Sequence, residues 1–242
     1  MPAPSPNWVV DEIIDHLRAL GSDENRAGMA RFGIVTDRSL GVRNTALRSL
    51  ARALKRDHER ALALWETGWR EARLLAVFTD DPKQVTAEQV RRWADGFDSW
   101  EIVDSASTLF VEAGHFDLVP AFAADEREFV LRAAFAMMAG AAVHRKNEPD
   151  ATFIEWLVLI ERHANDPRNF VRKAVNWALR QIGKRSTSLH AAALASSRRL
   201  AESSDRTARW IGNDAIRELT AARTLARIEV RQAEKGSRKI RR

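Results

Sequence analysis

Helical spacing of apolar residues recurs along almost the whole chain, and this pattern constrains the fold more than any other feature. Within segments of about 10 to 18 residues, apolar side chains fall at positions i, i+3, i+4 and i+7. Short breakers separate the segments, and none of them alternates apolar and polar residues as a half-buried strand does. We therefore predict an all-α protein. Its helices are expected within 7–21, 42–56, 58–68, 69–81, 85–96, 98–114, 125–146, 150–166, 167–184, 188–202 and 205–229.

The helices also have a regular order that favours one architecture. Pairs of helices joined by short loops recur at roughly 35–45 residues, which is the spacing of HEAT-like repeats. We predict a HEAT-like solenoid of about a dozen antiparallel helices. The amino-acid sequence shows no strict repeat, so a globular helical bundle is the alternative. Two helix starts are recognisable: Pro6 stands at the first helical position of the first segment, and Thr86 with Gln89 forms a capping-box pattern.

The domain organisation follows from the length of 242 residues, which is ample for a real core. We predict a single α-helical domain over 1–232 and a disordered basic tail over 233–242. The first residues show no basic stretch leading into an apolar run, so no secretory signal is predicted. The longest purely apolar run, 133–143, is too short to span a bilayer. A cytoplasmic location is expected.

The charge is distributed unevenly between the two ends. The chain has 39 Lys and Arg against 33 Asp and Glu, a net charge of 39 − 33 = +6. From Arg198 to the end, 13 basic and 6 acidic residues give +7, so the first 197 residues sum to −1. A basic C-terminal part is compatible with a polyanionic partner, and a solvated tail explains it equally simply.

The composition and the absence of known motifs exclude several kinds of structural, binding and catalytic site. The chain has no Cys, which excludes a disulfide framework, a zinc finger and a thiol nucleophile. Its six His residues are scattered without metal-ligand spacing. No glycine-rich nucleotide loop and no nucleophile elbow is present. An enzyme of this sequence is expected to use carboxylates, aromatic rings and cations, without a metal ion or another cofactor.

The 98–114 segment places an aromatic ring beside an acid on its polar side. At about 100° per residue, one face of this helix is apolar and is expected to lie in the core; it consists of Ile102, Val103, Ala106, Leu109 and Phe110. Trp100, Asp104, Ser107 and Thr108 fall on the opposite face, with Trp100 and Asp104 one turn apart. Either a neighbouring element covers the indole, or it is an aromatic platform beside an acid.

The 167–184 segment repeats the combination of an aromatic ring with charges. It carries a broad apolar stripe and a basic stripe of Lys173, Arg180 and Lys184, with Trp177 at the border between the two. Basic residues with an aromatic ring among them suit a phosphate backbone with its sugar or base. The simpler alternative is a tryptophan at the edge of the core beside solvated cations.

Arg132 is the third unusual position. It is the only charged residue within FVLRAAFAMMAGAAV, so its helix is apolar nearly all round. An unpaired buried guanidinium is costly. Arg132 must therefore find an anion or backbone carbonyls. The anion is either an acid on a neighbouring helix, such as Asp104 or Glu101, or a phosphate.

At these residues the sequence resembles the AlkD-type bacterial DNA alkylation-repair glycosylases, a HEAT-like all-helical family. The resemblance runs from about Gly33 to Thr220. It rests on the order and spacing of five stretches: LGVRNTALRSLARALKRDHERALALWETGWREARLLAV, DSWEIVDS, VLRAAFAMMAG, FVRKAVNWALRQIGK and ARWIGNDAIREL. The family's Trp-x-x-x-Asp element matches Trp100 and Asp104, its arginine on the apolar helix matches Arg132, and its second tryptophan matches Trp177.

The resemblance implies a monofunctional enzyme that hydrolyses the N-glycosidic bond of N3- and N7-alkylated purines in duplex DNA, without swinging the base into a pocket. Trp100 and Trp177 would pack against the deoxyribose, and Asp104 would stabilise the cationic sugar and orient water. Arg132 would hold a phosphate near the lesion. No cofactor is implied, and the protein is expected to act as a monomer.

The resemblance also implies where the DNA lies. It would follow a concave basic face, with Lys173, Arg180, Lys184 and Arg43 among the DNA-binding residues. Three positions depart from the family's common pattern, namely Glu101, Leu131 and the pair Asn44-Thr45, and they bear on DNA affinity and lesion range. Two alternatives to the glycosylase therefore stay open: a non-catalytic helical-repeat protein that binds DNA structures, and a solenoid that binds only protein partners.

Overall fold

The structure is a computed structural model that describes residues 3–230, and all regular secondary structure in this range is helical. The all-α prediction is confirmed. The chain forms two compact units, Met1–His115 and Phe116–Arg242, and each is considered by itself. The single domain over 1–232 therefore stays a prediction, and the basic tail expected at 233–242 lies outside the described residues.

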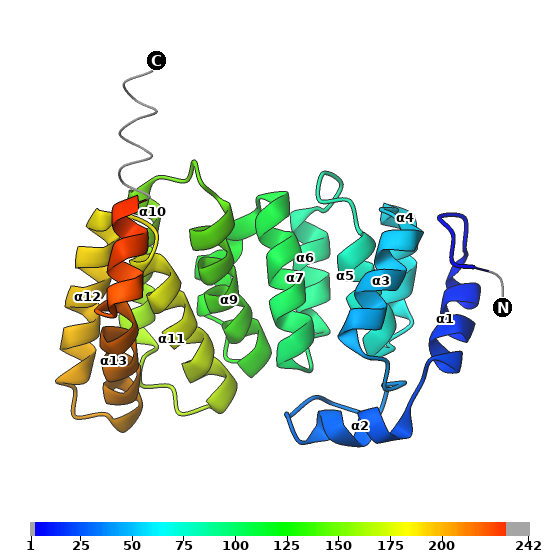
Figure 1. Ribbon diagram of the computed structural model, residues 1–242, viewed down its shortest axis with the longest axis horizontal. Coiled ribbons are helices and arrows are strands. Elements are labelled where there is room, and N and C mark those ends of the chain that lie inside the picture. Colours follow the sequence, from blue (N-terminus) through cyan, green and yellow to red (C-terminus); the bar gives the residue numbers. More distant parts are fainter. Residues whose placement is uncertain (1–2, 231–242) are drawn as a thin grey trace, which may run out of the picture. The chain divides into compact units, whose positions relative to one another are not determined.

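The first unit is built from short helices, and its longest connection is the segment 31–43 between α2 and α3 (Figure 1). Within it, α5 packs against α3, α4 and α7, and α1 packs against α4. In Figure 1, α2 runs across the direction of its neighbours. The helices of this unit are α1 (Val10–Ala19), α2 (Asp23–Ala30), α3 (Asn44–Leu54), α4 (His58–Glu66), α5 (Arg70–Thr79), α6 (Ala87–Asp95) and α7 (Trp100–Ala113).

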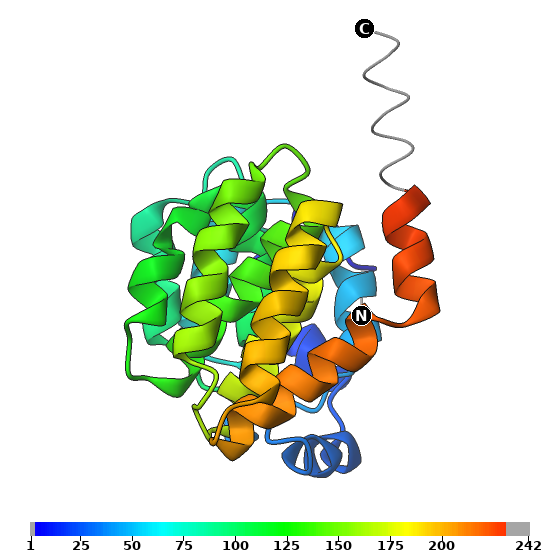
Figure 2. The same cartoon turned by 90° about the vertical axis from the view of Figure 1, so that its left-hand side faces the viewer.

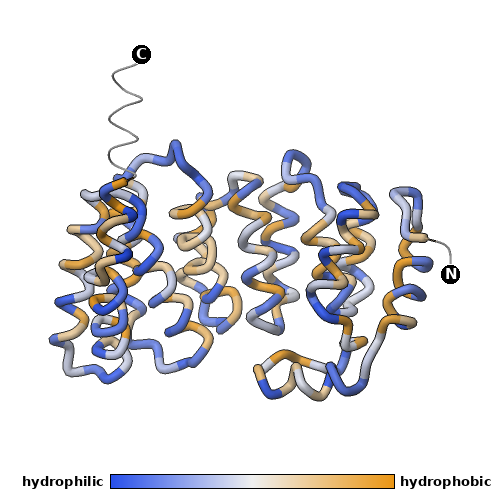
Figure 3. Tube along the Cα trace, in the orientation of Figure 1, coloured by the Kyte–Doolittle hydropathy of each residue, from blue (hydrophilic) through white to orange (hydrophobic). Residues whose placement is uncertain are grey.

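The second unit is organised around α9 and α11, which pack against each other. In Figure 3, α9 is coloured light orange over most of its length, and its side chains from Val130 to Ala139 are buried without interruption. The elements of this unit are the 3-10 helix η1 (His115–Leu118) at its boundary, α8 (Val119–Ala123), α9 (Glu128–His144), α10 (Asp150–Arg162), α11 (Asn169–Gly183), α12 (Thr187–Ala201) and α13 (Arg206–Leu219).

A close approach of backbones fixes α13 against α12. A side chain at Gly212 would bring its Cβ within 2.3 Å of the Ala201 nitrogen, which no real Cβ could tolerate. Glycine at this position therefore lets the two helices pack with their backbones nearly in contact. Figure 2 shows α13 inclined to α12, and the helical residues 222–230 as a separate rod after it.

Local hydrogen bonds explain where many of the helices begin. Side chains of Ser22, Asp57, Thr86, Ser186 and Asp205 each accept a hydrogen bond from a backbone N–H in the first turn of the following helix. Such caps satisfy N–H groups that have no partner inside the helix. The Thr86 cap confirms half of the predicted capping box.

One predicted capping interaction and two predicted helix boundaries differ from the structure. Gln89 does not complete the capping box, because its amide donates to the Asp80 carboxylate at 2.7 Å. Pro6 is not the first helical residue, since α1 begins at Val10, where Glu12 accepts from the Val9 N–H at 2.9 Å. The single helix expected over 205–229 is broken at 220–221.

No helix in the described part of the chain combines the length and the apolar character that a bilayer crossing requires. Among the same residues, no group of three or more His, Cys, Asp or Glu side chains could hold a metal ion.

Candidate nucleic-acid interface

The predicted core face of α7 is confirmed. Ile102, Val103, Ala106, Leu109 and Phe110 are all buried. The opposite face is narrower than expected, because Ser107 is buried as well, with its hydroxyl making no hydrogen bond within the described residues. Gly114 ends the helix in the left-handed conformation, at φ 97°, where glycine is favoured.

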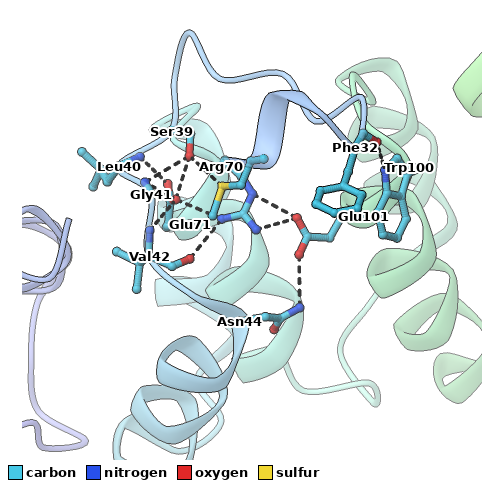
Figure 4. Close-up of polar contacts among 11 residues, drawn as sticks. Phe32, Ser39, Leu40, Gly41, Val42, Asn44, Arg70, Glu71, Trp100 and Glu101 are labelled. Carbon is cyan, nitrogen blue, oxygen red and sulfur yellow. Dashed lines mark hydrogen bonds and ion pairs between the residues drawn. The ribbon is translucent and has the colours of Figure 1, made fainter. Parts of the chain in front are cut away.

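Trp100 and Asp104 lie one turn apart on α7 and are both half-buried. The Trp100 indole N–H donates to the Phe32 carbonyl at 3.0 Å, as Figure 4 shows. Because this N–H is already used, only the ring of Trp100 is left for contact with a ligand. The Asp104 carbonyl accepts from the Thr108 hydroxyl at 3.1 Å. The row Trp100, Asp104, Thr108 therefore offers an aromatic ring beside a carboxylate.

A buried carboxylate holds the loop at residues 39–42, which precedes α3 (Figure 4). Glu71 is completely buried on α5, and it accepts from the backbone N–H groups of Leu40, Gly41 and Val42 at 2.9 to 3.2 Å. The Ser39 hydroxyl donates to the same carboxylate at 2.9 Å. We call these five residues the Glu71 cluster. Hydrogen bonds to a carboxylate are about twice as strong as neutral ones, so the cluster fixes the loop to α5.

Arg70 links the Glu71 cluster to the start of α7. Its guanidinium is buried and donates to Glu71 at 2.9 Å and to Glu101 at 3.0 and 2.5 Å. Glu101 also accepts from the Asn44 amide at 3.2 Å. The residue next to Trp100 is thus held from two sides (Figure 4). Two departures from the family pattern, Glu101 and Asn44, form this contact with each other.

Arg132 is buried in the second unit with 6% of its surface exposed. Its guanidinium donates to the Phe170 carbonyl at 2.6 Å, near the start of α11. This carbonyl is one of the two kinds of partner that a buried arginine was expected to need. Glu101, one of the two acids suggested for a salt bridge, is bound by Arg70 and Asn44 in the first unit. The phosphate-binding role of Arg132 stays a prediction.

The basic stripe of α11 is only partly open to solvent. Lys173 is exposed and Trp177 is half-buried. Arg180 and Lys184 both contact Glu218 of α13 at 2.5 Å, and Arg180 lies 3.5 Å from Asp214. Two of the three predicted DNA-binding cations on this helix therefore already have carboxylate partners.

These contacts continue along both helices. Asn176, which is buried, donates to Asp214 at 2.7 Å, and the Arg172 guanidinium stacks over the Trp210 ring at 5.2 Å. We call this set of contacts the α11–α13 ladder. It consists of Arg172 with Trp210, Asn176 with Asp214, Arg180 with Asp214 and Glu218, and Lys184 with Glu218.

The ladder changes the titration of Glu218. Burial acts to raise the pKa of this carboxyl, but the hydrogen bond from Lys184 and the positive charges of Arg180 and Lys184 outweigh it. The pKa of Glu218 is therefore lowered from its ordinary value of 4.5. Glu218 stays ionised at physiological pH and shares its single negative charge between the two cations.

Arg43 lies at the start of α3 and is exposed. Its guanidinium donates to the Asn25 side chain at 3.2 Å, and no carboxylate within 3–230 pairs with it. It keeps its charge available to an anion, and its DNA-binding role stays a prediction.

The sequence reasoning did not identify Arg70 and Glu71 as important. Both charges fall on the apolar segment WREARLLAVFT, where they sit among buried Ala and Leu residues. A charged pair on the core side of an amphipathic helix is the signal that could have drawn attention to them.

Comparisons with known proteins agree with this architecture. A search of curated proteins found no significant match. Among solved structures, one matches with a TM-score of 0.73 and 18% identity, covering 87% of this chain and 95% of that chain. It is described as belonging to a new family of proteins related to the HEAT-like repeat DNA glycosylases with affinity for branched DNA structures. A designed armadillo repeat protein is a weaker match, with a TM-score of 0.35, 18% identity and coverage of 73% and 92%.

The structural match supports the predicted HEAT-like helical-repeat fold. The family model for DNA alkylation repair enzymes covers residues 13–219, most of the chain. The protein is therefore a member of the DNA alkylation repair enzyme family.

Proposed function

We propose that this protein is a DNA glycosylase that excises positively charged N3- and N7-alkylated purines, such as 3-methyladenine and 7-methylguanine, from duplex DNA. The observation that carries the proposal is the row on α7, where the Asp104 carboxylate lies one turn from a half-buried Trp100 whose N–H is already bonded. Membership of the DNA alkylation repair family supports the choice of substrate.

The reaction needs few groups because the substrate is already activated. The bond from C1′ of the deoxyribose to the purine nitrogen breaks, and its electron pair neutralises the cationic purine, which leaves without being protonated. The oxygen of a water molecule bonds to C1′ and loses a proton to the solvent. Asp104 would stabilise the positive charge on the sugar and orient this water. The face of Trp100 would attract the same charge.

The residues of the second unit would contribute DNA contacts. Arg132 would contact a phosphate, and Trp177 would pack against a deoxyribose. Double-stranded DNA would be the partner and no cofactor would be required, with the protein acting as a monomer in the cytoplasm.

The test is the release of free base from methylated duplex DNA by the wild type and by Asp104→Asn. We expect the substitution to lower the excision rate by about 10²-fold or more, because it removes the negative charge that opposes the cationic sugar. Duplex binding should be kept. Asp11→Asn, the same change at an exposed acid on α1, serves as the control and should excise like the wild type. Equal excision by Asp104→Asn would refute the role of Asp104.

A second candidate function is binding to DNA structures without catalysis. It is favoured by the solved structure with the TM-score of 0.73, whose protein is described as having affinity for branched DNA. If it is right, neither the wild type nor Asp104→Asn will release base, while both will bind a four-way junction in a salt-sensitive manner. Binding that ignores salt would point to a protein partner instead.

A further inference from the structure

A groove in the first unit gathers basic side chains that the sequence analysis did not select. It lies among α3, α5 and α7 and has a volume of about 560 Å³. The cations that line it are Arg48, Arg52, Lys55 and Arg56, of which the first two lie on α3 and the last two directly follow it. Arg48 and Arg52 are one turn apart, so they share one face of the helix. We call this the α3–α5–α7 groove.

The carboxylates of the groove pair with only one of these cations. Two acids line it, Asp80 and Glu112. Asp80 is buried and is bonded to His58 at 2.7 Å, to Gln89 at 2.7 Å and to the Asp81 N–H. Glu112 pairs with Arg56 at 2.8 Å.

Three cations of the groove therefore remain uncompensated. Among residues 3–230, no carboxylate lies within ion-pair distance of Arg48, Arg52 or Lys55. Four cations against two carboxylates leave the groove with a net charge of 4 − 2 = +2. This arrangement is the opposite of the α11–α13 ladder, where acids occupy the cations.

An aromatic ring orients one of the cations. The Arg48 guanidinium lies over the Phe78 ring at 4.3 Å from its centre. Cation–π stacking holds a guanidinium in place without using its N–H groups. Arg48 is thus held in a defined orientation while its hydrogen-bond donors stay available to an anion.

The groove borders the row of α7 that carries the proposed chemistry. Ser105 and Thr108 line it, and Thr108 lies one turn after Asp104 on the helix surface. The Thr108 hydroxyl donates to the Asp104 carbonyl, so it is not free to donate to an anion in the groove. An anionic strand that reached Asp104 along α7 would meet Arg48 and Arg52 next.

We propose that the α3–α5–α7 groove binds the phosphodiester backbone of the DNA strand, with Arg48 and Arg52 as the phosphate contacts. The identification of the strand rests on the proposed function, while the anion site rests on the groove alone. Neither residue is among the DNA contacts predicted from the sequence, three of which lie on α11 or directly after it.

The test is the salt dependence of duplex binding, measured with the full chain between about 50 and 200 mM salt. Each lost phosphate contact lowers the magnitude of the slope of log K against log salt by about 0.9. We expect Arg52→Gln to lower it by this amount and Arg48→Gln with Arg52→Gln to lower it by about 1.8. The loss should be equal on undamaged and methylated duplexes, because phosphate contacts carry no sequence information.

Two further variants separate charge from packing. Arg48→Lys removes the stacked guanidinium but keeps the charge, so it should leave the slope near that of the wild type. Arg91→Gln changes an exposed arginine on α6 that does not line the groove, and it should leave the slope unchanged. Circular dichroism of each variant verifies that the helices are retained.

The outcomes distinguish this inference from the proposed function. A slope unchanged by Arg52→Gln and by the double variant overturns the groove as a phosphate site, even if the wild type excises base. A slope reduced as expected supports it, even if the wild type releases no base and the glycosylase proposal fails.

Discussion

In the α3–α5–α7 groove, Arg52 and Lys55 have no carboxylate within ion-pair distance among residues 3–230, whereas in the α11–α13 ladder Arg180 and Lys184 both contact Glu218 at 2.5 Å. Both regions are rich in cations in the sequence. They differ in which partners the nearby carboxylates bind. In the groove, Asp80 is bonded to His58 and Gln89, and Glu112 pairs with Arg56. The number of basic residues thus says less about anion binding than the placement of the acids does.

The buried acid of the first unit should matter most for stability. Glu71→Ala leaves Arg70 without one of its carboxylates and the backbone N–H groups of Leu40 and Val42 without an acceptor. We expect the free energy of unfolding to fall by about 3–5 kcal/mol, because each buried polar group left without a partner costs about 1–3 kcal/mol. Urea denaturation measures this loss. Glu59→Ala, at an exposed position on α4, should change it by no more than about 0.5 kcal/mol.

The acid of the second unit should matter more for DNA binding than for stability. Glu218→Gln releases Arg180 and Lys184 from their shared partner. If α11 faces the DNA as predicted, the salt slope of duplex binding should steepen by up to about 1.8, one increment for each freed cation. An unchanged slope would mean that the ladder lies away from the DNA, and would sharpen the contrast with the groove.

Replacing Trp177 tests the predicted DNA contact of the second unit without changing a residue of the ladder. Trp177→Ala should weaken duplex binding by at least about 1 kcal/mol if its ring packs on the DNA. Circular dichroism should show the helices unchanged. Loss of the fold would instead identify Trp177 as part of the core, and the comparison of two DNA-facing regions would no longer hold.

The smallest effect is the pH dependence of the ladder. Because the pKa of Glu218 is lowered in the folded protein, its contribution to stability is complete above the ordinary value of 4.5 and is lost as the pH falls through the lowered pKa. The difference in unfolding free energy between the wild type and Glu218→Gln should be up to about 1 kcal/mol at pH 7, as expected for pairs near the surface. It should shrink below pH 4.5. Urea titrations at a series of pH values measure it, and a difference that grows in acid would contradict the assignment.

The sequence predicted most helices because a buried stripe at helical spacing produces a strong pattern. It missed α2, whose segment DENRAGMA buries no residue and so has no stripe. It missed α8, which has only five residues. The core face of α7 followed from spacing, but the burial of Ser107 did not, because a small hydroxyl fits either side of a helix.

The candidate site was less predictable than the fold. Trp100 and Asp104 could be paired in advance because they belong to one helix turn. The partners of Arg180 and Lys184 lie 38 and 34 residues away, so no local pattern relates them. For the same reason the sequence offered Arg180 and Lys184 as DNA contacts and passed over Arg48 and Arg52.

The Glu71 cluster has a consequence for how the molecule opens. The N–H groups of Leu40, Gly41 and Val42 belong to a loop, yet each donates to the completely buried Glu71 side chain of α5. The Leu40 and Val42 amides can exchange with solvent deuterium only when their hydrogen bonds to this carboxylate break. Their protection against exchange therefore measures the free energy needed to separate the loop from α5.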